Sequence, residues 1–226
     1  MGKKKLVIIG ASPIAEIAYE YFTHDSEYEV CGFSVNKCYL NKDELFNLPI
    51  VELEKIETYF SPNEFYAFIA INYQQLNIPR TKIYIETKKK GYRIASYISS
   101  KAFVWHNAKI GENCFIFEDN TIQPFVTIGD NNIIWSGNHI GHHTTIGDNN
   151  FISSHVVISG SCKIGNNNFF GVNSTFANNL KIGNYNWFSP GVTIIKDVED
   201  KKLFKANKNF SAEISSFEFF KIEEQI

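Results

Sequence analysis

The sequence predicts an α/β domain followed by an all-β domain built from a repeated coil. Two patterns predict this fold class. Buried strands and amphipathic helices alternate over the first hundred residues, which is typical of a Rossmann-like α/β fold. From Val104 onward, an aliphatic or phenylalanine side chain returns at every sixth residue. Neither an α-helix, with its period of about 3.6 residues, nor an alternating strand explains a strict period of six.

The elements expected in the first domain, residues 1–99, alternate along the chain. Residues 4–10 are expected to form a buried strand, and Ser12 and Pro13 supply the N-cap and first-turn proline of a helix. Three more strands are expected at 28–34, 65–71 and 93–98, with helical stretches around 52–60 and 79–90. The resulting order β-α-β-α-β-α-β predicts a small N-terminal Rossmann-like domain.

The turn after the first strand keeps only the first glycine of the dinucleotide motif G-x-G-x-x-G, because its sequence is Gly10-Ala-Ser-Pro-Ile-Ala15. In α/β folds this turn presents backbone N–H groups and a helix N-terminus to phosphate. Val35 and Asn36 end the second strand, so the carboxylate that binds the ribose of NAD is missing. The sequence therefore predicts binding of a nucleotide but not of NAD.

The six-residue repeat defines the second domain, residues 100–200. Ile-Gly followed by an acidic residue or asparagine recurs every eighteenth residue from Ile110 to Ile182, so three hexapeptides make one turn. Residues eighteen apart should then stack in a column, about 4.8 Å from one another. The expected interior positions are Val104, Ile110, Ile116, Ile122, Ile128, Ile134, Ile140, Ile146, Ile152, Ile158, Ile164, Phe170, Phe176, Ile182, Phe188 and Ile194.

The composition indicates a small partner. The chain has 22 basic and 24 acidic residues with no block of five like charges, which argues against nucleic acid or a membrane surface as partner. The first apolar run ends at Gly10 after four residues, too short for a signal peptide or membrane span, so we expect a cytoplasmic protein. The four cysteines form no C-x-x-C pair, which argues against a zinc finger or a disulfide scaffold.

The most specific stretch of the repeat is Trp135-Ser-Gly-Asn-His-Ile-Gly-His-His-Thr-Thr-Ile-Gly, followed by Ile152-Ser-Ser-His-Val-Val-Ile-Ser-Gly160. With the α/β domain in front, the chain resembles the bacterial hexapeptide-repeat sugar acyltransferases over residues 4–200. The similar group is that of the sialic-acid O-acetyltransferases, which includes N-acetyltransferases of nucleotide-linked amino sugars. The resemblance implies a left-handed parallel β-helix, an exception to the right-handed crossover rule. It also implies acetyl-CoA as co-substrate, no metal, and a role in making precursors of surface glycans such as lipopolysaccharide.

The resemblance also implies the catalytic residues. Acyl transfer needs a base for the acceptor's proton and N–H donors for the developing oxyanion. The residue that matches the base is His142, which should point outward because it lies two places after the interior Ile140. Its column neighbour one coil along is Gly160, whose backbone N–H matches the oxyanion donor.

The residue that would orient the base departs from the family pattern. The family commonly has a carboxylate directly after the catalytic histidine, and this chain has His143. His143 could act as a neutral hydrogen-bond partner, or a carboxylate such as Glu118 or Asp119 could come from another column or subunit. Both alternatives remain open from the sequence.

Binding residues follow from the same resemblance. Coenzyme A is expected between adjacent β-helices of a homotrimer, in contact with Phe151, Gly160 and Val172. Outward aromatic residues such as Trp135 and Phe151 are expected to be buried in that trimer. The positions that match nucleotide-sugar contacts are Ser12, Pro13, Ile14, Val35, Asn36 and Asn72.

Three other functions remain open. A sugar O-acetyltransferase would use the same fold and base. A metal lyase of the carbonic-anhydrase type occurs on the same β-helix with three zinc-binding histidines; His106 and His142 are thirty-six residues apart, but Gly147 stands where a third ligand is expected. In a non-catalytic module, the first domain would sense a nucleotide and the coils would only trimerise.

The C-terminal tail, residues 201–226, has no expected role, although Ser215 and Glu218 could cap a short helix.

Overall fold

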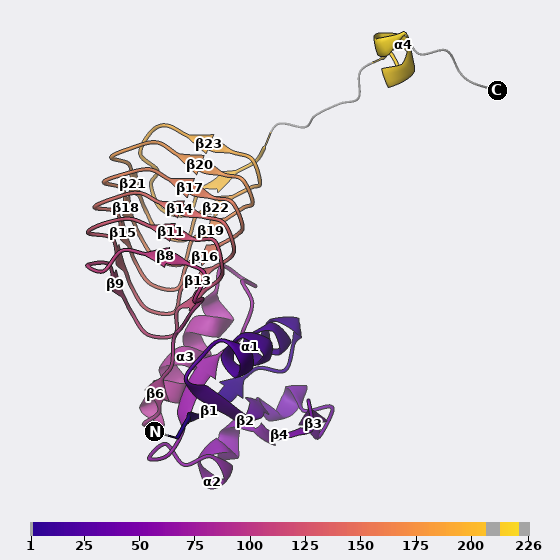
Figure 1. Cartoon of the computed structure of the whole chain (residues 1–226), viewed down its shortest axis with the longest axis vertical. Coiled ribbons are helices and arrows are strands. Elements are labelled where there is room, and N and C mark those ends of the chain that lie inside the picture. Colours follow the sequence, from indigo (N-terminus) through magenta and orange to yellow (C-terminus); the bar gives the residue numbers. More distant parts are fainter. Residues whose placement is uncertain (1, 207–212, 222–226) are drawn as a thin grey trace, which may run out of the picture.

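The computed structural model describes residues 2–206 and 213–221. Figure 1 shows an α/β domain, here called the front domain, and a stack of coils beyond it. The coils form a left-handed parallel β-helix, so the predicted fold class is confirmed. In the described part of the chain, no helix is long and apolar enough to cross a membrane.

The front domain is built around a six-stranded sheet with the order β3-β4-β2-β1-β5-β6. All neighbouring strands are parallel except β3 and β4. Its strands are β1 (Lys4–Ile9), β2 (Tyr28–Val35), β3 (Glu44–Leu45), β4 (Leu48–Glu52), β5 (Tyr66–Ile69) and β6 (Arg93–Ile94). Its helices are α1 (Pro13–His24), η1 (Lys37–Tyr39), η2 (Leu53–Lys55), α2 (Ile56–Tyr59) and α3 (Ile78–Lys89). As predicted, α1 has Ser12 at its N-cap and Pro13 in its first turn.

Three details of the front domain differ from the prediction. The pattern does not reveal β4, because Pro49 lacks the N–H group of an ordinary strand residue; β4 pairs with β2 through Ile50 and Val51. The helix expected at 52–60 is divided into the short turn η2 and the four-residue helix α2. The strand expected at 93–98 is two strands in two sheets, since β6 pairs with β5 whereas β7 (Tyr97–Ile98) already pairs with β10 of the coils.

The coils consist of three parallel sheets of two-residue strands, paired in a register of eighteen residues except in the last turn, where Trp187 pairs with Leu203, sixteen residues later. The covered sheet, which faces the front domain, contains β7, β10 (Phe115–Ile116), β13 (Ile133–Ile134), β16 (Phe151–Ile152), β19 (Phe169–Phe170), β22 (Trp187–Phe188) and β24 (Leu203–Phe204). The second coil sheet contains β8 (Phe103–Val104), β11 (Thr121–Ile122), β14 (His139–Ile140), β17 (Val157–Ile158), β20 (Thr175–Phe176) and β23 (Thr193–Ile194). The third coil sheet contains β9 (Lys109–Ile110), β12 (Thr127–Ile128), β15 (Thr145–Ile146), β18 (Lys163–Ile164) and β21 (Lys181–Ile182).

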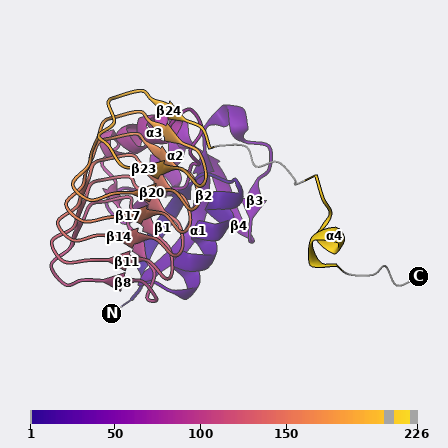
Figure 2. The ribbon, with the colours of Figure 1, turned by 90° about the horizontal axis from the view of Figure 1, so that it is seen from above.

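The interior and the corners of the coils explain the sequence repeat. The predicted interior residues from Ile116 to Phe188 are all at most 4% exposed. Between strands the chain turns through a residue with left-handed backbone every sixth position, for example Asn113 at φ 51° and Asn149 at φ 62°. Asparagine tolerates this conformation better than most residues, which accounts for its frequency in the repeat. Three sheets around one interior give the coils a triangular cross-section, and Figure 2 shows the coils stacked one on another.

Aromatic side chains join the front domain to the covered sheet. Phe22 of α1 and Phe68 of β5 pack with Phe115 of β10 in one cluster, with ring centroids 4.9 to 6.4 Å apart. Further along the coils, the Tyr73 ring packs on Phe151, and their centroids are 4.8 Å apart. Phe151 is only 3% exposed. The expectation that Phe151 is an outward residue left for a trimer to bury was therefore wrong, because the chain's own front domain covers this sheet.

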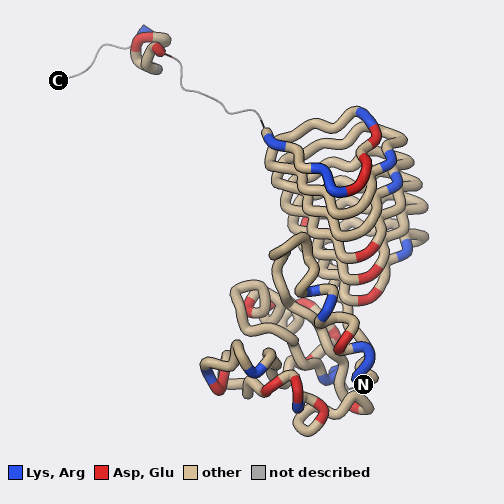
Figure 3. Tube along the Cα trace, turned by 180° about the vertical axis from the view of Figure 1, so that it is seen from behind, with Lys and Arg blue, Asp and Glu red and all other residues tan. Residues whose placement is uncertain are grey.

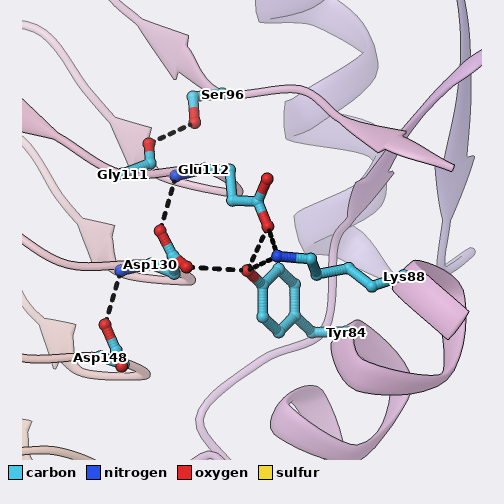
Figure 4. Close-up of polar contacts among 7 residues, drawn as sticks. All are labelled: Tyr84, Lys88, Ser96, Gly111, Glu112, Asp130 and Asp148. Atoms are coloured by element: carbon cyan, nitrogen blue, oxygen red, sulfur yellow. Dashed lines mark hydrogen bonds and ion pairs between the residues drawn. The ribbon is translucent and has the colours of Figure 1, made fainter.

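Polar contacts join α3 to the edge between the third and the covered sheets, here called the domain corner (residues 111–114, 129–132, 147–150 and 165–168). The Tyr84 hydroxyl donates to Glu112 at 2.5 Å and lies 3.0 Å from Asp130 Oδ2 (Figure 4). Lys88 forms an ion pair with Glu112. One turn earlier, the buried Arg80 donates from Nη2 to the backbone oxygens of residues 131 and 150. These contacts fix the front domain on the coils.

Charged residues are sparse on the coils. Figure 3 shows acidic residues following one another along one edge of the coils nearest the front domain.

At the C-terminal end, α4 (Ser216–Phe220) begins with the predicted capping box of Ser215 and Glu218. The other residues of the tail include 207–212 and 222–226, which lie outside the described residues.

Candidate active site

His142 lies on the edge between the second and third coil sheets, here called the histidine corner (residues 123–126, 141–144, 159–162 and 177–180). Ile140 ends β14 with its side chain inside the coil, and His142 follows two residues later with its side chain exposed, as predicted. The His142 N–H group donates to Gln123 Oε1 of the preceding coil at 2.9 Å. This contact holds the backbone of the histidine at the edge.

His143 contacts the ring of His142. The two Nδ1 atoms are 3.1 Å apart, so one of them carries the hydrogen and the other accepts it. The His143 ring stacks on Phe125, with centroids 4.6 Å apart. If His142 Nδ1 is the donor, the lone pair of His142 lies on Nε2, where a base needs it.

Gly160 lies directly beside the His142 ring, one coil further along. A Cβ atom placed on Gly160 would be 2.8 Å from both Nε2 and Cε1 of His142. Real Cβ atoms do not approach other atoms so closely, so the ring can occupy this position only because residue 160 has no side chain. The structure therefore brings His142, His143 and Gly160 together at one edge, as their spacing in the sequence predicted.

Two residues of this corner were missed by the sequence analysis. Gln123 binds the His142 N–H group, as described above. Asn178, one coil beyond Gly160, accepts a hydrogen bond from the Gly160 N–H group at 3.0 Å through Oδ1. The column spacing of eighteen residues could have found Asn178, because it is eighteen residues from Gly160 and thirty-six from His142.

The predicted cofactor residues are not all at this corner. Phe151 lies in the covered sheet beneath Tyr73 and has almost no surface for a ligand. Val172 is 41% exposed but follows β19, at the edge between the covered and second sheets, here called the far corner (residues 117–120, 135–138, 153–156 and 171–174). Within one chain, only Gly160 of the three lies beside His142.

Glu118 belongs to the far corner as well. Its two carboxylate oxygens accept hydrogen bonds from the Tyr21 hydroxyl and the Ser136 hydroxyl, both at 2.6 Å. Burial alone would raise the pKa of Glu118, but the hydrogen bonds from Ser136 and Tyr21 outweigh it and hold the pKa below its usual range. Glu118 thus connects α1 to the coils, and among the described residues it is His143 whose side chain forms a hydrogen bond with the His142 ring.

A separate pocket of about 650 Å³ lies in the front domain. It opens at the carboxyl ends of β1 and β5, where the strand order reverses and α/β proteins bind ligands. Gly10 has a φ of 135°, and a Cβ atom there would run into the Ala70 backbone oxygen, so the tight turn after β1 requires glycine. The pocket contains all six residues predicted to bind a nucleotide sugar: Ser12, Pro13, Ile14, Val35, Asn36 and Asn72.

The polar groups of this pocket favour an anionic ligand. Lys82 of α3 carries the one full charge among the described residues that line it. The N-terminal turns of α1 and α3 also contribute Pro13 and Pro79 to the lining, so the partial positive ends of both helices face the pocket. The buried Ser34 hydroxyl has no hydrogen-bond partner among the described residues. The sequence pattern does not reveal Lys82 or Ser34, since neither belongs to the motif after the first strand.

No group of three or more histidine, cysteine, aspartate or glutamate side chains is arranged to hold a metal ion within residues 2–206 and 213–221.

Comparisons with known proteins agree with this architecture. The family model described as bacterial transferase hexapeptide (six repeats) matches residues 107–142, 125–160 and 143–178. A comparison with curated protein sequences gave no match.

Solved structures are similar over nearly the whole chain. The acetyltransferase domain of PglB from Neisseria gonorrhoeae FA1090, in complex with acetyl coenzyme A, is 19% identical with a TM-score of 0.79, over 89% of this chain and 96% of that one. PerB from Caulobacter crescentus, in complex with CoA and GDP-perosamine, is 20% identical with a TM-score of 0.77, over 88% of this chain and 92% of that one. A histidine-to-asparagine mutant of perosamine N-acetyltransferase from the same organism is 19% identical with a TM-score of 0.79 and the same two coverages.

At these identities the solved structures establish the fold, and the family model shows that residues 107–178 carry the hexapeptide repeat. The resemblance predicted from the sequence is confirmed: residues 107–178 match the bacterial transferase hexapeptide model, and the chain has the same fold as the acetyltransferases named above.

Proposed function

We propose that this chain is an acetyl-CoA-dependent N-acetyltransferase that acts on a nucleotide-linked amino sugar, with His142 as general base. The observation that carries the proposal is the contact of the His142 ring with both His143 and the bare backbone of Gly160. A base, a group that orients it and an edge free of side chains are the parts that acyl transfer needs. The structural neighbours in complex with acetyl-CoA, CoA or GDP-perosamine support the choice of substrates.

In the proposed reaction the acceptor amine attacks the thioester carbonyl carbon of acetyl-CoA. His142 Nε2 takes a proton from the amine as the new N–C bond forms, and His143 Nδ1 accepts the hydrogen bond from His142 Nδ1 and so supports the charge on the ring. The Gly160 N–H group stabilises the oxyanion. When the C–S bond breaks, the imidazolium returns the proton to the sulfur of coenzyme A.

The nucleotide part of the acceptor is assigned to the front-domain pocket. The cation Lys82, the two helix N-termini and the Ser34 hydroxyl, which has no partner in the described part of the chain, suit a phosphate-containing ligand. The six residues that resemble nucleotide-sugar contacts all line this pocket.

The site requires more than one chain, and we assign it to a homotrimer. The front domain contacts the covered sheet and the domain corner, whereas His142 lies at the edge between the other two sheets. The proposed cofactor residues Gly160 and Val172 also lie at different corners. A ligand that touches both corners, and an acceptor held in the front-domain pocket, can meet His142 if neighbouring chains pack side by side.

The proposal is tested by a thiol-release assay with acetyl-CoA and a panel of nucleotide-linked amino sugars. Each amino sugar is paired with the nucleotide sugar that carries a hydroxyl at the same position. We expect release of coenzyme A with an amino sugar and none with its hydroxyl partner. Turnover only of hydroxyl sugars would establish the O-acetyltransferase instead, and binding without turnover would establish a non-catalytic module.

A further inference from the structure

The Gly160 N–H group, assigned to the oxyanion in the proposed function, is already engaged in this structure. Asn178 Oδ1 accepts its hydrogen at 3.0 Å. An oxyanion donor must lie about 2.7–3.1 Å from the oxygen that it stabilises. The carboxamide oxygen of Asn178 therefore occupies the place that a thioester oxygen would need.

The same kind of contact recurs between successive coils at the domain corner, where it forms a continuous ladder of hydrogen bonds. There the Asp148 side chain accepts the N–H of Asp130, and the Asp130 side chain accepts the N–H of Glu112 (Figure 4). Each side chain binds the backbone of the coil eighteen residues before it. Asn178 is the corresponding residue at the histidine corner.

The histidine corner interrupts this ladder at His142. Gly160 has no side chain to accept the N–H of His142, and Gln123 accepts it from the opposite direction. The next contact, from Asn178 to Gly160, is retained. The ladder is thus interrupted beside the His142 ring, and the remaining contact involves the N–H group that the proposed reaction uses.

We propose that Asn178 is a positioning residue that competes with the acyl donor for the Gly160 N–H group. The inference rests on the proposed function, because only a thioester at this corner gives the competition a consequence. Asn178 is exposed, so its carboxamide can turn into solvent when the thioester oxygen takes its place. Acetyl-CoA must displace this hydrogen bond, whereas coenzyme A, which has no carbonyl next to its sulfur, need not.

The test is calorimetric titration of the full chain with acetyl-CoA and with coenzyme A, in the wild type and in Asn178→Ala and Asn178→Asp. Freeing the N–H group in Asn178→Ala should raise the affinity for acetyl-CoA relative to coenzyme A by about two- to tenfold, the worth of one hydrogen bond. Asn178→Asp should lower the same ratio, because a carboxylate holds the N–H group more strongly. The ratio of the two affinities does not change when a substitution affects only the binding of the part that acetyl-CoA and coenzyme A share.

Asn166→Ala is the matched control. Asn166 accepts the N–H of Asp148 in the ladder of the domain corner and is exposed as Asn178 is, so its loss should leave the ratio unchanged. An unchanged or lower ratio in Asn178→Ala, with both ligands binding the wild type, would overturn this inference alone. Failure of the wild type to bind either ligand would overturn the proposed function and this inference with it.

Discussion

His142 and His143 form a pair in which the Nδ1 atoms lie 3.1 Å apart. A histidine at position 143 differs from a carboxylate in two respects. It is neutral when it accepts a hydrogen bond, and its Nδ1 atom can accept only when its own hydrogen is on Nε2. Its backbone φ of 58° is the one found at the equivalent corner residues, so the fold explains the conformation of His143 without a functional constraint. Any catalytic role of His143 therefore lies in the contact of its ring with the ring of His142.

Replacing His142 should remove the base while leaving the fold intact. His142→Ala is expected to lower kcat by about 10²–10⁴-fold, the usual contribution of a positioned base. Folding and acetyl-CoA binding should change little, because the ring is exposed and lies outside the isoleucine interior. Steady-state thiol release and calorimetry measure the two effects, and His24→Ala, an exposed histidine at the end of α1, is the control. Full activity of His142→Ala would rule out the proposed mechanism.

Changing His143 should act through the orientation and charge of His142. His143→Ala should cost less turnover than His142→Ala, since it removes the partner and leaves the base. His143→Glu places a negative charge beside the ring and stabilises imidazolium, so the acid limb of the pH–rate profile should move to higher pH. A larger loss in His143→Ala than in His142→Ala would show that the base is the other histidine.

Much of the histidine corner could be predicted from the sequence, because residues eighteen positions apart lie next to each other on successive coils. His142 and Gly160 are eighteen residues apart, and a register of eighteen requires them to be neighbours. The covered position of Phe151 could not be found in this way. The repeat fixes which side chains point outward, but only the docking of Tyr73 and α1 determines which outward face is buried. Lys82 was missed for a related reason, because its place in the pocket depends on how α3 packs beside the sheet.

Lys82 should determine affinity for the nucleotide sugar. Lys82→Ala removes the charge that the described part of the chain contributes to the pocket and should weaken binding of a nucleoside diphosphate sugar by about tenfold or more, the effect of one lost charged hydrogen bond. Lys82→Arg should retain most of the affinity, and the affinity for acetyl-CoA should not change in either variant. Calorimetry with the nucleotide sugar and with NAD checks the assignment. Tight binding of NAD by the wild type, with no response to nucleotide sugars, would contradict it.

The Glu118 carboxylate should make the contact between α1 and the coils sensitive to acid. Its hydrogen bonds from Ser136 and Tyr21 lower its pKa in the folded protein, so its contribution to stability is present above the pKa of the unfolded chain and is lost as the pH falls through the folded value. Glu118→Gln should therefore lower the free energy of unfolding by about 1–2 kcal/mol at pH 7 and by much less near pH 3. Urea unfolding at both pH values measures this difference, with the exposed Asp119→Asn as control. An equal loss at both pH values would show that the side chain acts by packing alone.

A methyl group at Gly160 should disable the same step as the loss of His142. The added Cβ would be 2.8 Å from Nε2 and Cε1 of His142, and the exposed ring can move away, so Gly160→Ala should displace the base at little cost in stability. Turnover should fall toward the level of His142→Ala, and acetyl-CoA should bind more weakly because the methyl also obstructs the thioester. The double variant His142→Ala with Gly160→Ala tests whether the effect passes through the ring. If it does, the second substitution adds only its effect on acetyl-CoA binding, and kcat at saturating acetyl-CoA stays at the level of His142→Ala. Independent, multiplicative losses in kcat would mean that Gly160 and His142 act separately, and the assignment of this corner as one catalytic unit would then be wrong.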